Sequence, residues 1–190
     1  MNRFETWFCG SRYWRYLTRR RLLPWLLQGS ELGEHVLELG AGPGAATEEL
    51  KRRAARVTSL EYDHGFAARL GARVSGTNIN IIQGDAAMLP FPDNTFSSAI
   101  AILMLHHLRS PELQDHAFAE ICRVLRPGGV FLALEIPNGW MHRVGHIRST
   151  FVPIAPASVS ARLTNAGFSH ATVDFQSGGF RIRALRAREN

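Results

Sequence analysis

Short apolar runs alternate with helix-length amphipathic segments from residue 35 onward, and this alternation restricts the fold more than any other feature. Five runs are nearly continuous in apolar residues and occupy positions 36–39, 57–60, 79–82, 96–105 and 130–134. Strands that are buried on both faces give such runs, whereas a half-solvated strand alternates apolar with polar residues. The pattern therefore predicts βαβ units and a parallel sheet that is covered by helices on both faces.

The best-marked helix lies between the fourth and fifth runs. Ser110 can cap its start, Pro111 fits its first position, and Pro127 with the two glycines that follow is expected to end it. After residue 137 the pattern loosens before a short helix over residues 157–166. Two final β-like runs, 171–176 and 180–185, are joined by a pair of glycines and predict a hairpin. With 190 residues, one globular domain is expected.

Residues 1–30 differ in composition from the rest, with six arginines, one acidic residue and several aromatic residues. We expect two helical pieces that break near Gly10 and Pro24 and end at Gly29. This segment is expected to serve as a helical lid or substrate segment. Its aromatic side chains can pack on the sheet or make peripheral contact with a membrane surface. No apolar run is long enough for a transmembrane helix, and a cytoplasmic location is expected.

A glycine-rich turn follows the first apolar run. Gly40, Gly42 and Gly44 precede a helix pattern over residues 45–53, and such a turn lets backbone approach a ligand closely. Glu61 closes the second run at the distance that a ribose contact requires. Taken alone, these residues do not distinguish a site for NAD from a site for another adenosine ligand.

Three further segments resemble motifs of the class I S-adenosylmethionine-dependent methyltransferases. Glu38 stands two residues before Gly40; Gln-Gly-Asp-Ala at 83–86 leads into Leu-Pro-Phe-Pro-Asp-Asn-Thr-Phe; and residues 120–129 read Glu-Ile-Cys-Arg-Val-Leu-Arg-Pro-Gly-Gly. Together with Glu61, these segments resemble the methyltransferase type 11 domain of the small-molecule branch, which includes the ubiquinone and menaquinone biosynthesis enzymes. The resemblance covers residues 35–137 in order. Ser97 departs from it, since an Asp usually follows Phe96.

The resemblance implies a single-domain, doubly wound, Rossmann-like α/β/α sandwich, mostly parallel with a C-terminal antiparallel hairpin, with residues 31–190 as the methyltransferase domain. It implies S-adenosyl-L-methionine as cofactor and S-adenosyl-L-homocysteine as product. Glu61 is assigned to the ribose hydroxyls, Asp85 to the adenine amino group, and Glu38 to the loop or to the amino group of the ligand. The full expected cofactor set is Glu38, Gly40, Ala41, Gly42, Gly44, Glu61, Tyr62, Asp85, Ala86, Ile102 and Leu103.

His106 and His107 follow the fourth apolar run, at the edge of the sheet where ligands bind in open α/β folds. Methyl transfer needs a base only when the acceptor is a hydroxyl, an acidic carbon or a protonated amine. The two histidines are therefore expected either to move a proton or only to shape the pocket. His142 and His146 are weaker candidates.

The residues that several other enzyme classes need are absent from this sequence. Lys51 is the only lysine and stands in no P-loop, dehydrogenase or kinase context, while Cys9 and Cys122 do not form a metal-binding motif. No metal is therefore expected, and a nicotinamide-dependent oxidoreductase has no catalytic Tyr-Lys pair.

A net charge of +6 can indicate nucleic-acid binding, but the arginines of this chain fall in three distant stretches. Residues 97–100 also lack the Asn/Asp-Pro-Pro-Tyr signature of the enzymes that methylate nucleic-acid amines. A small, apolar or aromatic acceptor is expected. A nucleic-acid methyltransferase and a non-catalytic cofactor-binding subunit remain as alternatives.

Overall fold

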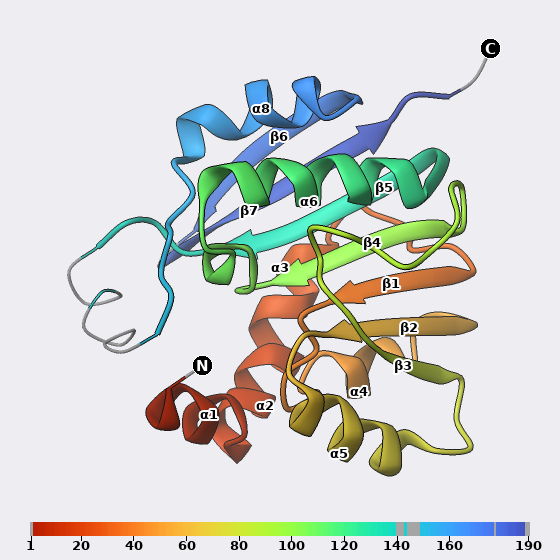
Figure 1. Ribbon diagram of the computed structural model, residues 1–190, viewed down its shortest axis with the longest axis vertical. Coiled ribbons are helices and arrows are strands. Elements are labelled where there is room, and N and C mark those ends of the chain that lie inside the picture. Colours follow the sequence, from red (N-terminus) through yellow and green to blue (C-terminus); the bar gives the residue numbers. More distant parts are fainter. Residues whose placement is uncertain (1, 140–142, 144–148, 177, 189–190) are drawn as a thin grey trace.

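The parallel sheet predicted from the apolar runs is the centre of the molecule (Figure 1). The structure, a computed structural model, describes residues 2–139, 143, 149–176 and 178–188. Within these residues the sheet has the order β3-β2-β1-β4-β5-β7-β6. The first five of these strands are mutually parallel, and the last two form an antiparallel pair beside β5. The strands are β1 (His35–Leu39), β2 (Arg56–Glu61), β3 (Ile79–Gln83), β4 (Phe96–Ile102), β5 (Leu125–Glu135), β6 (Phe168–Gln176) and β7 (Gly179–Arg186).

Helices cover both faces of the sheet, so the predicted three-layer sandwich is confirmed (Figure 1). One core lies under α6 (Pro111–Val124) and α8 (Pro156–Asn165), where Phe118 and Leu163 pack with Phe131. The other core includes Leu132 of the same strand, together with side chains of the helices α3 (Leu23–Leu27), α4 (Thr47–Leu50) and α5 (His64–Val74). Successive residues of β5 thus enter opposite cores, because side chains alternate along a strand.

The C-terminal hairpin is also confirmed. β6 and β7 pair in antiparallel register from Phe168↔Arg186 to Gln176↔Gly179, and Gly178 in the turn has a φ of +88°. The predicted hairpin was too short, since β6 begins at Phe168 rather than at residue 171.

Two boundaries around the fourth and fifth strands differ from the prediction. β4 ends at Ile102 rather than at residue 105, because Leu103 takes a left-handed φ of 52° and a 3-10 turn, η2 (Leu105–His107), follows. Helix α6 ends at Val124, and Pro127 lies inside β5 instead of ending the helix. The register between β4 and β5 shifts at this point, and such an irregularity tolerates a proline without an N–H.

The helix predicted over residues 45–53 is also wrong in length, since α4 covers only Thr47–Leu50. The reason is a tertiary contact. The side-chain amide of Asn78 donates to the carbonyl oxygens of Lys51 at 3.1 Å and of Ala54 at 2.8 Å. These bonds satisfy carbonyl groups beyond the helix end, and nothing in the local sequence signals them.

The N-terminal segment is helical in several pieces. The predicted break at Gly10 is confirmed, since it separates α1 (Arg3–Cys9) from α2 (Arg12–Leu17). Pro24 does not interrupt the chain; it lies in the first turn of α3, after a π-helix, η1 (Thr18–Leu22). The wider π turn accommodates a residue that cannot donate a backbone hydrogen bond. No helix in the described part of the chain combines the length and apolarity needed to cross a membrane.

Candidate functional site

A cavity of about 1020 Å³ lies at the carboxyl ends of the parallel strands. The chain segments after β1, β2, β3 and β4 line its floor, and the inner faces of α1 and α2 line its outer wall. Ten of the eleven expected cofactor residues line this cavity: Glu38, Gly40, Ala41, Gly42, Glu61, Tyr62, Asp85, Ala86, Ile102 and Leu103.

Gly44 is the exception, and its surroundings explain why. Its φ is +85°, and a Cβ there would lie 2.5 Å from a methyl carbon of Leu70 on α5. Arg73 on the same helix donates to the carbonyl of Pro43 at 2.6 Å. The glycine therefore allows the loop to pack closely on α5, and it does not face the cavity.

Gly40 and Gly42 form the part of the loop that a ligand can approach. Both have a positive φ, +71° and +52°. A Cβ on Gly40 would clash with Met104, whereas one on Gly42 would meet no atom within 4 Å. The backbone at Gly42 is thus open toward the cavity, as close contact with a ligand requires.

Glu61 links the loops that follow β1 and β2. It is 8% exposed, and its carboxylate accepts from the backbone N–H of Gly42 at 2.7 Å and of Asp63 at 2.8 Å. Each carboxylate oxygen has two acceptor sites, so both retain capacity for a hydroxyl. The arrangement fits a group with two neighbouring hydroxyls, such as a ribose.

Glu38 is buried beneath the loop. Its Oε2 accepts from the hydroxyls of Thr47 and Ser59, both at 2.6 Å. Burial raises the pKa of this carboxyl, and the two hydroxyl donors oppose that change. Because it ties β1 to β2 and to the first residue of α4, the geometry favours the loop-orienting role of the two that the sequence suggested.

Asp85 and Ala86 form a tight turn after β3. Oδ1 of Asp85 accepts from the N–H of Ala87 at 2.9 Å, and its carbonyl accepts from Met88 at 3.1 Å. Asp85 is thus a turn former, and Oδ2 makes no hydrogen bond within the described residues. One carboxylate oxygen remains for an amino group of a ligand.

Leu103 completes the floor of the cavity on the far side of the loop. Its N–H donates to the carbonyl of Leu134 at 2.9 Å, which holds the left-handed conformation in place. Non-glycine residues in this conformation are uncommon and cluster at ligand sites. Tyr62, on the opposite rim, is 65% exposed.

His106 is held by a carboxylate that the sequence analysis missed. Nδ1 of His106 lies 2.6 Å from Oε2 of Glu135, and both side chains are almost fully buried. The other oxygen of Glu135 accepts from the N–H of Leu105 at 2.8 Å. The only signal in the sequence is an acidic residue at the end of an otherwise apolar strand. A carboxylate on Nδ1 orients the imidazole and favours the tautomer that carries its proton on that nitrogen.

His107 is oriented differently. Its Nδ1 donates to the carbonyl of Thr150 at 3.0 Å, and its ring centroid lies 4.4 Å from that of His106. It has a backbone partner rather than a carboxylate, and it is partly exposed. His142 and His146 lie outside the described residues.

The inner face of the N-terminal helices was not assigned to the site residue by residue. Phe8, Cys9, Trp14 and Thr18 line the cavity, and the rings of Phe8 and Trp14 lie 5.3 Å apart. Burial, together with the charge of Glu5, raises the pKa of the Cys9 thiol to about 11, so it is protonated at neutral pH. This wall is largely apolar, and no cluster of metal-ligating residues occurs among the residues that the structure describes.

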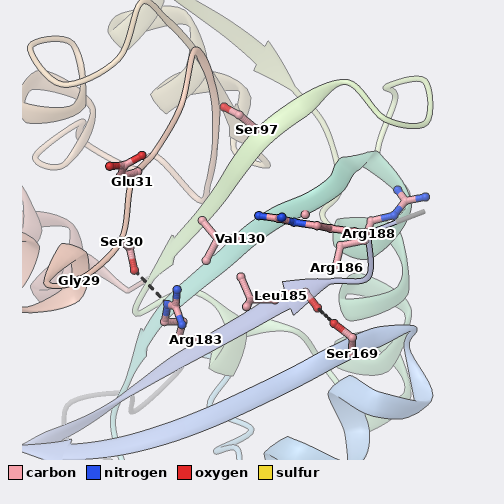
Figure 2. A pocket seen from close by; sticks show the side chains of 11 residues that line it. Gly29, Ser30, Glu31, Ser97, Val130, Ser169, Arg183, Leu185, Arg186 and Arg188 are labelled. Atoms are coloured by element: carbon pink, nitrogen blue, oxygen red, sulfur yellow. Dashed lines mark hydrogen bonds between the residues drawn. The ribbon is translucent and has the colours of Figure 1, made fainter. Parts of the chain in front are cut away.

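A second cavity, of about 540 Å³, lies at the amino ends of β4 and β5, beside β7 (Figure 2). Three arginines line it, together with Ser30 and Ser97. Arg186 donates to the carbonyls of Cys122, Arg123 and Leu125 at the end of α6, and Arg183 donates to Ser30. The single hydroxyl hydrogen of Ser97 is shared between the carbonyls of Leu32, at 2.7 Å, and His35, at 2.9 Å. These polar groups therefore form hydrogen bonds with other parts of the protein.

Comparison with known proteins identifies the family. The model of the family described as "Methyltransferase domain" matches residues 37–133. A demethylmenaquinone methyltransferase of Thermobifida fusca is 32% identical over 149 residues, which are 71% of this chain and 59% of that relative. The chain spans between 48% and 59% of the length of the first curated relatives that it matches.

Solved structures agree on the fold. A protein from Pyrococcus horikoshii OT3 has a TM-score of 0.79 at 19% identity, over 98% of this chain and 99% of that one. A chain solved in complex with the Trm112 methyltransferase activator of Haloferax volcanii has a TM-score of 0.77 at 16% identity, over 99% of each chain. The family model extends from β1 to β5, and the glycine loop, Glu61 and Asp85 lie at one cavity. The chain therefore belongs to the class I S-adenosylmethionine-dependent methyltransferases.

Proposed function

We propose that the protein transfers the methyl group of S-adenosylmethionine to a small apolar or aromatic acceptor, with residues 1–30 as a lid over a methyltransferase domain of residues 31–190. One observation carries the proposal. A single cavity is lined by the loop at Gly42, by His106, which is held by the buried Glu135, and by the rings of Phe8 and Trp14. Cofactor, base and acceptor therefore have adjoining places in one cavity.

Glu61, Asp85 and the backbone at Gly42 hold the cofactor in this proposal. When bound, S-adenosylmethionine supplies a sulfonium-activated methyl group. The protein's remaining tasks are to orient the acceptor, to exclude water and to remove a proton where the acceptor carries one. The helices α1 and α2, whose residues line the outer side of the cavity, are the elements proposed to exclude water.

His106 is the proposed proton acceptor. Its imidazole would take the proton of a hydroxyl or an acidic carbon, which leaves an electron pair on the acceptor atom for the methyl group that the cofactor would supply. Glu135 holds the imidazole through Nδ1 at 2.6 Å and stabilises the imidazolium that forms. His107, whose Nδ1 is bonded to a backbone carbonyl, shapes the pocket beside it.

The lining of the cavity supports an apolar acceptor. Leu108, Leu113 and Ile136 line the same cavity as the two histidines, and so do the aromatic rings of Phe8 and Trp14. Aromatic side chains bind flat apolar rings well. The name demethylmenaquinone methyltransferase, which curated relatives carry, points the same way. A cytoplasmic location stays a prediction.

An acceptor screen tests the proposal. S-adenosylhomocysteine release is measured with quinols, phenols, amines and carboxylates, and in parallel with RNA and DNA oligonucleotides. We expect turnover with quinols or phenols. Turnover only with oligonucleotides would replace the proposal with a nucleic-acid methyltransferase. Tight cofactor binding by calorimetry without turnover on any acceptor would identify a non-catalytic subunit.

A further inference from the structure

The N-terminal helices have a second face that the proposed reaction does not use. Trp7, Tyr13 and Tyr16 are 68%, 64% and 62% exposed, although they are large and largely apolar. Three of the six exposed large hydrophobic side chains in the described residues thus lie on α1 and α2. Such clustering marks a contact surface, whereas single exposed side chains do not.

Arginines flank Tyr13 and Tyr16 along the chain. We call the whole surface the outer face, and it consists of Trp7, Arg12, Tyr13, Arg15, Tyr16, Arg19 and Arg20, all exposed. From Arg12 to Leu22 the chain contains no acidic residue. Arg19 lies 3.4 Å from Glu49, whereas Arg12 and Arg20 have no carboxylate within ion-pair distance among the described residues. The outer face therefore carries uncompensated positive charge.

The opposite side of the same helices is directed inward. Trp14 and Thr18, four residues apart, line the main cavity, and Thr18 is 1% exposed. Tyr13 and Tyr16, three residues apart, share the other side, because residues at this spacing lie on one face of a helix. Each helix thus has one side in the cavity and one side in solvent, and the two sides differ in chemistry.

We propose that the outer face binds the surface of a membrane that contains anionic lipids. Tyrosine and tryptophan are the side chains that prefer the boundary between headgroups and acyl chains, because each combines an apolar ring with a polar edge. Arginines beside them bind lipid phosphates. Charge of one sign, without interspersed carboxylates, matches an anionic surface better than the mixed surface of a protein partner. Bound in this way, the lid lies between the bilayer and the cavity.

Vesicle co-sedimentation of the full chain tests this inference without any methyl acceptor. Vesicles of phosphatidylcholine alone are compared with vesicles of phosphatidylcholine and phosphatidylglycerol, at low and high salt. We expect binding to the mixed vesicles only, weakened by salt because the screening length shortens. Equal binding to both vesicle types, or no binding to either, would overturn the proposal, and the second result would leave a protein partner as the occupant.

Two sets of substitutions locate the surface. Replacing Arg12, Arg15 and Arg20 with Gln should weaken binding about 100-fold, since each arginine near an anionic surface contributes about 1 kcal/mol. The matched control replaces the exposed Arg53, Arg56 and Arg126 with Gln, which removes the same charge elsewhere. An equal loss in the control would show that binding follows net charge and not the outer face.

The apolar contribution is tested separately with Tyr13→Ser and Tyr16→Ser. We expect these changes to weaken binding even at high salt, where the arginine contribution is small. Cofactor calorimetry on each variant confirms folding. Since none of the substituted residues lines the cavity, cofactor affinity should stay unchanged, and a failed methyl-transfer assay would not alter the vesicle result.

Discussion

The two ends of the parallel sheet are built from the same strands, yet they use their polar groups in opposite ways. At the carboxyl ends, Glu61, Asp85 and His106 line a large cavity, and the carboxylates of Glu61 and Asp85 keep acceptor capacity for a ligand. At the amino ends, Arg186 and Ser97 line a smaller cavity (Figure 2), but both are bonded to backbone carbonyls. A cavity that is lined by polar residues is therefore not by itself a ligand-binding site.

The difference follows from the direction of the chain. In a βαβ unit the loops that leave the carboxyl ends of the strands lead to helix starts, where backbone N–H groups are free to bind ligands. The helices end at the opposite side, where carbonyl groups lack partners. Arg186 satisfies three such carbonyls after α6. We expect substitutions at the carboxyl ends to change catalysis or cofactor binding, and substitutions at the amino ends to change stability.

The largest effect is expected at His106. Its replacement with Ala should lower kcat by about 10²–10⁴-fold, because the proton then has no positioned acceptor. Cofactor affinity, measured by calorimetry, should hardly change. The Glu135→Gln variant should show a smaller loss and a shifted pH–rate profile. Unchanged kcat in the His106 variant on an acceptor with a hydroxyl would rule out the base role.

The next effect concerns the amino end. Arg186→Met should lower the free energy of unfolding by about 2–4 kcal/mol, because it leaves carbonyls of the α6 terminus without donors. Urea denaturation measures the loss. Arg188→Met, an exposed neighbour in the same cavity, is the control and should change stability by less than about 0.5 kcal/mol. Weaker cofactor binding by a folded Arg186 variant would contradict the comparison.

A somewhat smaller effect is expected for cofactor binding at Glu61. Glu61→Ala removes the acceptor proposed for two hydroxyls, and hydrogen bonds to a charged group contribute about 1.5–3 kcal/mol, so affinity should fall roughly 10- to 150-fold. Glu31→Ala, at the amino-end cavity, should leave affinity as it is. Calorimetry with S-adenosylhomocysteine measures both, and equal affinities in the two variants would remove Glu61 from the site.

The smallest effect is a pH dependence at His35, which begins β1 at the amino end. Its Nε2 lies 2.9 Å from the hydroxyl of Thr58, and burial together with Arg56 and Arg126 lowers its pKa below the ordinary 6.5. The unfolded chain then binds more protons just below pH 6.5, so the contribution is full above that pH and is lost as the pH falls. In urea denaturation, wild type should lose more stability than His35→Gln between about pH 7.5 and 5.5. Equal losses of stability in the two proteins would contradict a lowered pKa of His35.

The sequence predicted the sheet and the gathering of the cofactor motifs because both depend on local patterns. Buried parallel strands read as apolar runs, and Glu61 and Asp85 each end or follow a strand whose carboxyl end lies at the same edge. The pair of His106 and Glu135 was not predicted, because its members lie 29 residues apart and only the β4–β5 pairing brings them together. The short α4 was missed for the same reason, since Asn78 reaches it from another element.

The π-helix Thr18–Leu22 sets the angular position of everything that precedes it. Helix α3 is anchored in the core by Leu23 and Leu26, whereas α2 is attached to it only through this wider turn. One residue corresponds to about 100° of rotation in an α-helix. Deleting a single residue here would convert the π turn to an ordinary one and turn α2 about its axis, so that Trp14 would leave the cavity and the outer face would no longer point to solvent. The extra residue thus determines which side chains of α2 line the cavity and which lie on the surface of the molecule.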